Sequence, residues 1–124
     1  MANDILIIED DEFLREMLVK KISSEGFGVS QAVNGQDGID KIKSEMPRLV
    51  LLDLLLPDLS GFDVLLRAKA DSSTASIPIV ILSNLGQKED IDKGLNLGAT
   101  DFLIKSQFTT EEIVEKIKNI FKTK

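Results

Sequence analysis

Three short runs of apolar residues recur along the chain, and each of them ends abruptly at a polar side chain. The runs Ile5–Ile8, Leu49–Leu52 and Ile79–Leu82 contain only Ile, Leu and Val. Such runs are typical of strands in a parallel sheet, where helices cover both faces and no position needs a polar side chain. The chain is therefore expected to be an α/β protein with these three strands at the centre of its sheet.

Between the strands lie segments with the spacing of amphipathic helices. The residues expected to face inward are, helix by helix, Phe13, Leu14, Met17, Leu18 and Ile22; Ile39, Ile42 and Met46; Phe62, Leu65 and Leu66; Ile91 and Leu95; and Ile113, Ile117, Ile120 and Phe121. Gly26, Pro47 and Gly98 are expected to end the first, second and fourth of these helices. Pairs with capping-box spacing, Ser60 with Asp63 and Thr109 with Glu112, precede the third and the fifth. Two shorter strands, Val29–Ala32 and Phe102–Ile104, suit the sheet edges. Strand and helix alternate five times. This predicts a single doubly wound (βα)5 domain over residues 1–124, with a parallel five-stranded sheet in the order 2-1-3-4-5.

The polar residues that follow the strands are expected to share one edge of this sheet. Glu9 and Asp10 follow the first strand, Asp53 the third, Ser83 the fourth and Lys105 the last. Because all strands of a parallel sheet end on the same side, these side chains should face a common crevice between the first and third strands. A single turn residue there would be ordinary, but polar groups at four strand ends indicate a functional site.

The charges of these residues indicate what the crevice binds. The three carboxylates and the Lys105 ammonium sum to about −2, which a divalent cation would neutralise. The chain has no His and no Cys, which excludes imidazole and thiolate metal sites and a Ser-His-Asp triad. Oxygen ligands favour Mg²⁺, Mn²⁺ or Ca²⁺. A hard cation that retains waters fits Mg²⁺, with Mn²⁺ possible. Asp53 could then attack a phosphorus atom and become an aspartyl phosphate.

The overall charge limits the partners of the chain. It has 21 acidic and 15 basic residues and a formal net charge of −6, which repels nucleic acid and anionic membranes. The first strand begins within a few residues of Met1, and no apolar run approaches the length of a membrane span. Together with the lack of Cys, these features predict a cytoplasmic protein that binds neither nucleic acid nor membrane.

Several local motifs occur in combination. An acidic pair follows the first strand, Asp53, Pro57 and Gly61 form an Asp-x-x-x-Pro-x-x-x-Gly turn, a hydroxyl residue follows the fourth strand, and the last strand lies within Gly98-Ala99-x-Asp101-Phe102-x-x-Lys105. In this combination the chain resembles the response regulator receiver domain, the CheY-like family of two-component signalling, over almost its whole length. The resemblance implies a flavodoxin-like fold and phosphorylation of Asp53.

The resemblance also assigns the acidic residues to a metal site. Asp10 and Asp53 would be direct Mg²⁺ ligands together with the backbone carbonyl of Leu55, and Glu9 would be the second acid, acting through water. The acidic run also allows Asp10 and Asp11 as the pair. We favour Glu9 and Asp10, because the first apolar run ends directly before them.

Three further residues have implied roles in switching. Ser83 resembles the residue that bonds the phosphoryl group and shifts on activation, Lys105 resembles the family's lysine, and Phe102 resembles the aromatic residue that changes rotamer. Core packing is the alternative interpretation of Phe102.

Two positions depart from the family pattern. Ser106 follows Lys105 where the family usually has proline after a cis bond, and a cis bond before serine would cost about 2.5–4 kcal/mol. A trans, reshaped loop is therefore expected, which puts the approach of Lys105 in doubt. Asn84 stands where the family favours a small residue, and it could either bond phosphate or narrow access to it.

Leu55 and Leu85 lie at positions that influence hydrolysis of the acyl phosphate in the family. Both are apolar, which predicts slow hydrolysis and a long-lived phosphorylated state.

The resemblance implies a stand-alone response regulator that catalyses only its own phosphotransfer and dephosphorylation. A sensor histidine kinase or histidine phosphotransfer protein, docking near the first helix, would phosphorylate Asp53. The face around residues 87–108 would then change its binding of an unknown protein target, and no output domain is expected.

Two rival functions require residues that the chain lacks. A haloacid dehalogenase-type phosphatase would need a second aspartate at the position of Leu55, and a flavodoxin-like cofactor module would need a hydroxyl-rich loop where the acidic residues 9–12 stand. A phosphorylation-independent binding module is the remaining alternative.

Overall fold

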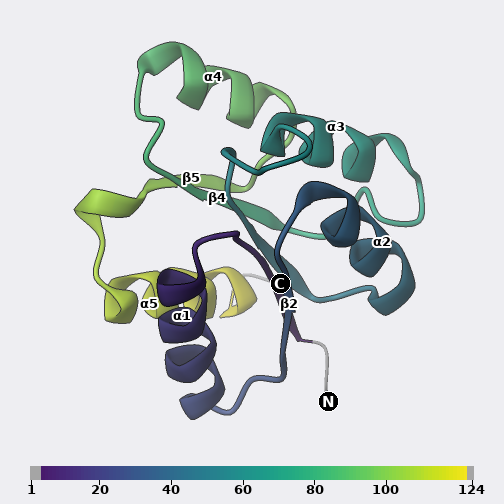
Figure 1. Ribbon diagram of the computed structural model, residues 1–124. Coiled ribbons are helices and arrows are strands. Elements are labelled where there is room, and N and C mark those ends of the chain that lie inside the picture. The colour runs from purple at the N-terminus through teal and green to yellow at the C-terminus, as the bar shows by residue number, and fades with distance from the viewer. Residues whose placement is uncertain (1–3, 123–124) are drawn as a thin grey trace.

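Strands and helices alternate along residues 4–122, the part of the chain that the computed structural model describes (Figure 1). The elements are β1 (Ile5–Ile8), α1 (Glu12–Ser24), β2 (Val29–Ala32), α2 (Gly35–Glu45), β3 (Leu49–Leu52), α3 (Gly61–Ala70), β4 (Ile79–Ser83), α4 (Lys88–Asn96), β5 (Asp101–Ile104), the 3₁₀ turn η1 (Lys105–Gln107) and α5 (Thr110–Lys122). The predicted strands and helices are all present, with ends that differ by a residue or two. Within residues 4–122, the one element that was not predicted is the short turn after β5.

The sheet has five parallel strands in the order β2-β1-β3-β4-β5, as predicted. Ile8 at the end of β1 pairs with Leu52 at the end of β3, and Leu52 pairs in turn with Ile81 of β4. This register brings the ends of the central strands to the same height. The residues that follow these strands therefore start from neighbouring points on one edge of the sheet.

The three apolar strands are buried on both faces because helices cover both. Figure 1 shows α2, α3 and α4 on one side of the sheet and α1 and α5 on the other. Alternate residues of each strand enter separate clusters. The first cluster takes Leu6, Ile8, Val50, Leu52, Ile79 and Ile81, and the second takes Ile5, Ile7, Leu49, Leu51, Val80 and Leu82. Full burial of each such side chain contributes about 1.5–3 kcal/mol relative to exposure.

Side-chain caps fix where most of the helices begin. Asn34 accepts from the amide of Asp37 at the start of α2, and Thr109 and Glu112 form the predicted reciprocal capping box before α5. At α3, Ser60 accepts from the amide of Phe62 instead of that of Asp63. The predicted cap is therefore present before α3, although it does not use the Ser60–Asp63 pair as expected.

The prediction that Phe13 and Met17 face the core is wrong. The buried residues of α1 are Leu18 and Ile22, whereas Phe13 is 74% exposed and Met17 is 41% exposed. Each residue turns a helix by about 100°, so the stripe centred on Leu18 and Ile22 leaves the other two apolar side chains outside it. An exposed apolar pair therefore lies on the first turns of α1.

Three other apolar residues predicted to face inward are also exposed. Leu66 directly follows the buried Leu65, and Leu95 directly follows the buried Gly94, so each is turned about 100° away from the core. Met46 lies beyond the end of α2 as its C-cap, with a left-handed backbone (φ 48°). The apolar stripes of these helices are narrower than the sequence spacing suggested.

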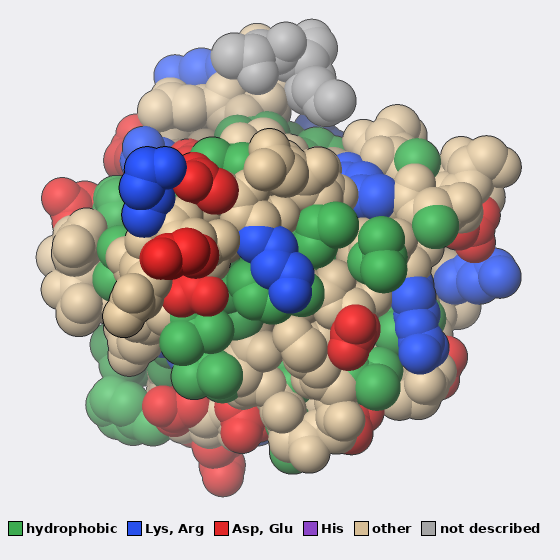
Figure 2. All heavy atoms as spheres, turned by 90° about the horizontal axis from the view of Figure 1, so that it is seen from above, with side chains coloured by type: hydrophobic (Ala, Val, Ile, Leu, Met, Phe, Trp, Pro, Cys, Tyr) green, Lys and Arg blue, Asp and Glu red, His purple; other side chains and the backbone are tan. Residues whose placement is uncertain are grey.

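The surface on the side of α3 and α4 mixes apolar, basic and acidic side chains without one dominant kind (Figure 2). Between residues 4 and 122, the helices are all too short or too polar to cross a membrane.

Candidate functional site

The backbone of the sheet sets the positions of Glu9 and Asp53. The amide of Glu9 donates to the carbonyl of Ala32 (3.0 Å), and the amide of Asp53 donates to the carbonyl of Ile8 (3.0 Å). Both bonds continue the parallel ladder one residue beyond the assigned strands. Glu9 and Asp53 therefore leave the edge of the sheet side by side, from adjacent strands.

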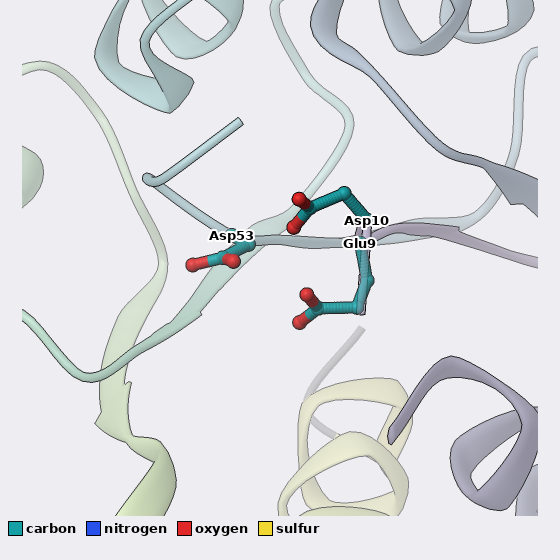
Figure 3. Close-up of side chains that lie close together, drawn as sticks. All are labelled: Glu9, Asp10 and Asp53. Carbon is teal, nitrogen blue, oxygen red and sulfur yellow. The ribbon is translucent and has the colours of Figure 1, made fainter. Parts of the chain in front are cut away.

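The structure brings three predicted acidic residues together. Glu9, Asp10 and Asp53 each place a carboxylate oxygen within 4.8 Å of the others, and Figure 3 shows Glu9 and Asp10 extending toward the side of Asp53. Glu9 is 2% exposed and Asp53 4%, whereas Asp10 is exposed. Asp11 accepts instead from the amide of Leu14 as the N-cap of α1. The geometry thus favours Glu9 and Asp10, not Asp10 and Asp11, as the acidic pair.

Lys105 reaches both buried carboxylates. Its Nζ lies 2.7 Å from Oε1 of Glu9 and 3.1 Å from Oδ2 of Asp53. Residues 4–122 contain no cis peptide bond, so the bond between Lys105 and Ser106 is trans, as expected. The trans loop nevertheless delivers Lys105 to Asp53, which removes the doubt raised by the missing proline.

Burial and ion pairing shift the pKa values of this pair. Burial raises the pKa of the Glu9 carboxyl, and the Lys105 hydrogen bond only partly opposes it. Burial lowers the pKa of the Lys105 ammonium, but the hydrogen bond that the ammonium donates to Glu9 and the charge of Asp53 outweigh this effect and leave the pKa raised. Lys105 therefore stays positively charged at neutral pH beside the acidic cluster.

Arg15, which the sequence pattern did not indicate, also contacts the acidic segment. Its Nη1 donates to the backbone carbonyl of Glu9 (2.8 Å), and its Nε donates to the side chain of Gln31 (3.0 Å). The sequence feature that could have indicated this contact is a basic residue about one helical turn after the acidic run of residues 9–12. Arg15 holds the backbone at the end of β1 in place.

Ser83 and Asn84 lie at the end of β4. Ser83 is fully buried, and its hydroxyl oxygen accepts from the amide of Leu85 at 3.4 Å. The side-chain oxygen of Asn84 accepts from the amide of Ser106 at 3.2 Å. Asn84 therefore ties the loop after β4 to the loop that carries Lys105.

Phe102 packs in the core under α4. A Cβ atom added to Gly94 would lie 2.7 Å from Cδ1 of Ile81 and 3.1 Å from Cδ2 of Phe102, so the absence of a side chain at Gly94 lets α4 approach the ring closely. Phe102 is half-buried and joins the cluster on this face, in agreement with the packing interpretation. A rotamer change of Phe102 stays a prediction.

The loop from Asp53 to Gly61 is held close to the site. The amide of Gly61 donates to the carbonyl of Leu54 (2.9 Å), and the amide of Leu55 lies 3.4 Å from Oδ1 of Asp53. The backbone of Leu55, a predicted metal ligand, therefore starts beside the predicted phosphoacceptor. The Leu55 side chain is 57% exposed and occupies the position where a dehalogenase-type phosphatase would need an acid.

Comparison with known proteins agrees with this arrangement. The sequence profile described as the response regulator receiver domain matches residues 5–118. The chain belongs to this family. As a receiver domain it is a signalling domain of two-component systems, and receiver domains interact with histidine kinases.

Three similar proteins illustrate the relationship. The receiver domain is 36% identical over 118 residues to the DNA-binding dual master transcriptional regulator RpaA of Synechocystis, covering 95% of this chain and 48% of RpaA. It is 34% identical over 122 residues to the phosphate regulon transcriptional regulatory protein PhoB of Escherichia coli, covering 98% of this chain and 53% of PhoB. The crystal structure of a CheY-like receiver domain protein from Methanospirillum hungatei gives a TM-score of 0.91 at 26% identity, covering 99% and 96% of the two chains.

The chain thus spans about half the length of the curated relatives that it matches. The DNA binding named for RpaA is a property of that whole protein. The expectation that this receiver domain works without an output domain stays a prediction.

The acidic cluster of this receiver domain fits the Mg²⁺ that the family binds at an acidic pocket. The cluster offers carboxylate oxygens alone, from two buried residues and one exposed residue. Hard oxygen donors with one open side suit Mg²⁺, which keeps several waters when it binds to proteins.

Proposed function

We propose that this receiver domain accepts a phosphoryl group on Asp53 in a Mg²⁺-dependent reaction and thereby switches its binding of a protein partner. The donor is a sensor histidine kinase or a histidine phosphotransfer protein. The observation that carries the proposal is the position of Asp53. Its buried carboxylate lies next to those of Glu9 and Asp10, and the Lys105 ammonium is 3.1 Å from it.

The residues of the site divide the work of the transfer. Asp10, Asp53 and the backbone carbonyl of Leu55 would hold Mg²⁺, which when bound neutralises charge on the phosphoryl oxygens. A carboxylate oxygen of Asp53 attacks the phosphorus of the partner's phosphohistidine. An O–P bond forms as the P–N bond breaks. The electron pair of the broken bond stays on the imidazole nitrogen, which takes a proton from solvent.

The same residues would report the new group to the surface. Lys105 and the Ser83 hydroxyl would each bond a phosphoryl oxygen, which moves Ser83 away from its present contact with the amide of Leu85. This shift favours one of two arrangements of residues 87–108, including the rotamer of Phe102.

The test is incubation with acetyl phosphate, with and without Mg²⁺, followed by intact-protein mass spectrometry. We expect the mass of one phosphoryl group to be gained in Mg²⁺ and not in EDTA, because the carboxylates alone repel the donor. If the folded protein gains no mass with Mg²⁺, the phosphorylation-independent binding module becomes the better description.

Phe13 is expected to contribute to docking of the phosphodonor protein. It is 74% exposed, and Met17, one turn further along α1, lines a hollow of about 320 Å³ together with Lys105 and Phe108. An exposed aromatic residue on the first turn of α1, three positions after Asp10 in the sequence, can serve as a binding anchor. Phe13→Ser should lower the rate of transfer from a phosphohistidine partner about tenfold or more and leave the rate with acetyl phosphate unchanged.

The matched control for Phe13 is Leu66→Ser, which removes an apolar side chain that is 52% exposed on α3. Both rates should stay at the wild-type level in this variant. Equal losses with the protein donor and with acetyl phosphate in Phe13→Ser would show an effect on the site itself and not on docking.

Leu55 and Leu85 are expected to slow hydrolysis of the acyl phosphate. Leu55 is exposed and its amide lies 3.4 Å from Oδ1 of Asp53, and the amide of Leu85 contacts the Ser83 hydroxyl. Both apolar residues therefore start next to the proposed phosphoacceptor or its hydroxyl neighbour, where they would hinder an attacking water. Leu55→Asn and Leu85→Lys should shorten the lifetime of the phosphorylated protein several-fold, measured by the decay of the phosphoryl mass after the donor is removed. An unchanged decay rate in both variants would reject this role.

A further inference from the structure

Asp58, in the loop between β3 and α3, binds the start of α2. Its Oδ1 accepts from the amide of Gly35 (2.7 Å), and its Oδ2 accepts from the amide of Gln36 (2.9 Å). The first amides of a helix have no partner within the helix. The next two amides, those of Asp37 and Gly38, donate to the side chain and the backbone carbonyl of Asn34. With the two bonds to Asp58, each of the first four amides of α2 has an acceptor.

The bonds of Asp58 fix the far side of the loop that contains Leu55. The near side is fixed where the amide of Gly61 donates to the carbonyl of Leu54. Only Leu55–Pro57 lie between these two attachments, and the Leu55 carbonyl is among them. The path of this short segment is therefore set from both ends.

Gly35 allows the close approach of the two elements. A Cβ atom at Gly35 would lie 2.9 Å from Cβ of Leu59 and 3.2 Å from Oδ1 of Asp58. The hydrogen bonds from Gln36 and Gly35 also lower the pKa of the Asp58 carboxyl. Asp58 thus stays ionised, and the contact stays intact, down to a lower pH than an ordinary aspartate would allow.

We propose that Asp58 is a positioning residue for the metal site, holding the Leu55 carbonyl where it can bind a divalent cation. The inference rests on the proposed function, because that function supplies the cation. Without the attachment to α2, the segment Leu55–Pro57 would have to be ordered when the ion binds. That ordering opposes binding, and supporting residues of this kind typically change metal affinity by about tenfold or more.

The test measures Mn²⁺ binding to the full chain by electron paramagnetic resonance, with Mg²⁺ competition to obtain the Mg²⁺ affinity. Asp58→Asn replaces one acceptor oxygen by an NH₂ group that faces a backbone amide. Gly35→Ala disturbs the same contact from α2 while improving the helix propensity of that position. Both variants should bind the ions about tenfold more weakly and regain the wild-type rate with acetyl phosphate at saturating Mg²⁺.

The control is Asp71→Asn, at the other end of α3. Asp71 also accepts from a backbone amide, that of Ser73, and its pKa is also lowered. This variant should lose a similar local contact without any change in metal affinity. Circular dichroism and urea unfolding establish that each variant is folded under the conditions of the binding measurement.

The outcomes separate the two proposals. Equal affinities in the wild type and in folded Asp58→Asn would overturn the role of Asp58 and leave the proposed function standing. A wild-type chain that binds neither Mn²⁺ nor Mg²⁺ would overturn the proposed function and this inference with it.

Discussion

Replacing Asp53 with Asn is expected to abolish phosphorylation completely, with no gain in mass after incubation with acetyl phosphate and Mg²⁺. The amide of Asn lacks the anionic oxygen that attacks phosphorus, and we assign the neighbouring acids Glu9 and Asp10 to the proposed ion site and not to acceptance of the phosphoryl group. Asp63→Asn, which removes an exposed carboxylate from the first turn of α3, should gain the phosphoryl mass like the wild type. A persistent gain in Asp53→Asn would place the acceptor on another residue.

The same variant should also change stability in a way that depends on the ion. Removing one of three carboxylates that lie within 4.8 Å of one another relieves repulsion. Lys105 keeps its 2.7 Å contact with Glu9. We therefore expect a higher free energy of unfolding for Asp53→Asn than for the wild type in EDTA, measured by urea titration. In Mg²⁺ the order should reverse, because an ion at 100 times its Kd stabilises the wild type by about 2.7 kcal/mol and binds the variant more weakly.

The fold and the convergence of the acidic residues were predictable because both follow from the geometry of a parallel sheet. Uninterrupted apolar runs identify strands covered on both faces, and the ends of such strands share one edge. Glu9 and Asp53 could therefore be placed together although 43 other residues separate them in the sequence. This inference needed only strand order and direction, and no knowledge of side-chain packing.

The inward faces of the helices were less predictable because an apolar side chain does not reveal how wide the buried stripe is. On α1 the sequence offers five apolar residues at helical spacing, but the sheet covers only the side centred on Leu18 and Ile22. On α4 the inward position is taken by Gly94, which has no side chain to mark it. Tertiary packing, which spacing alone does not contain, decided these positions.

Contacts between loops were not predictable at all, because they join residues without a periodic pattern. The two departures from the family pattern prove to be bonded to each other, with Asn84 accepting from the amide of Ser106. A proline at that position would have no amide hydrogen to donate. Asn84 and Ser106 are therefore best understood as one change that holds the Lys105 loop by a hydrogen bond. Asp58 and α2 form a second contact of this kind.

Gly61→Ala is expected to lower the free energy of unfolding by about 1–3 kcal/mol or more, a large part of the 5–15 kcal/mol typical of a domain. A Cβ atom at this position would lie 2.3 Å from the carbonyl oxygen of Asp53 and 2.6 Å from Cα of Leu54. Both are backbone atoms, which cannot turn aside as the end of a side chain can. The better helix propensity of Ala would return at most about 1 kcal/mol. Urea unfolding measures the net loss.

Gly61, the glycine of the Asp-x-x-x-Pro-x-x-x-Gly turn, is thus required for the close approach of α3 to the backbone of Asp53 and Leu54. It is not required for a left-handed backbone, which among the glycines of residues 4–122 occurs at Gly26 and Gly98. The matched control is Gly86→Ala, which should be near neutral. Its Cβ would lie 3.0 Å from the flexible end of Ile104, and the nearest backbone atom, the carbonyl oxygen of Asn84, would lie at 3.9 Å, an ordinary contact distance. Because the clash at Gly61 pushes on the backbone of Asp53 itself, the folded fraction of Gly61→Ala should also be phosphorylated more slowly than the wild type. Wild-type stability and rate in Gly61→Ala would show that the loop can move away from α3 without disturbing the site.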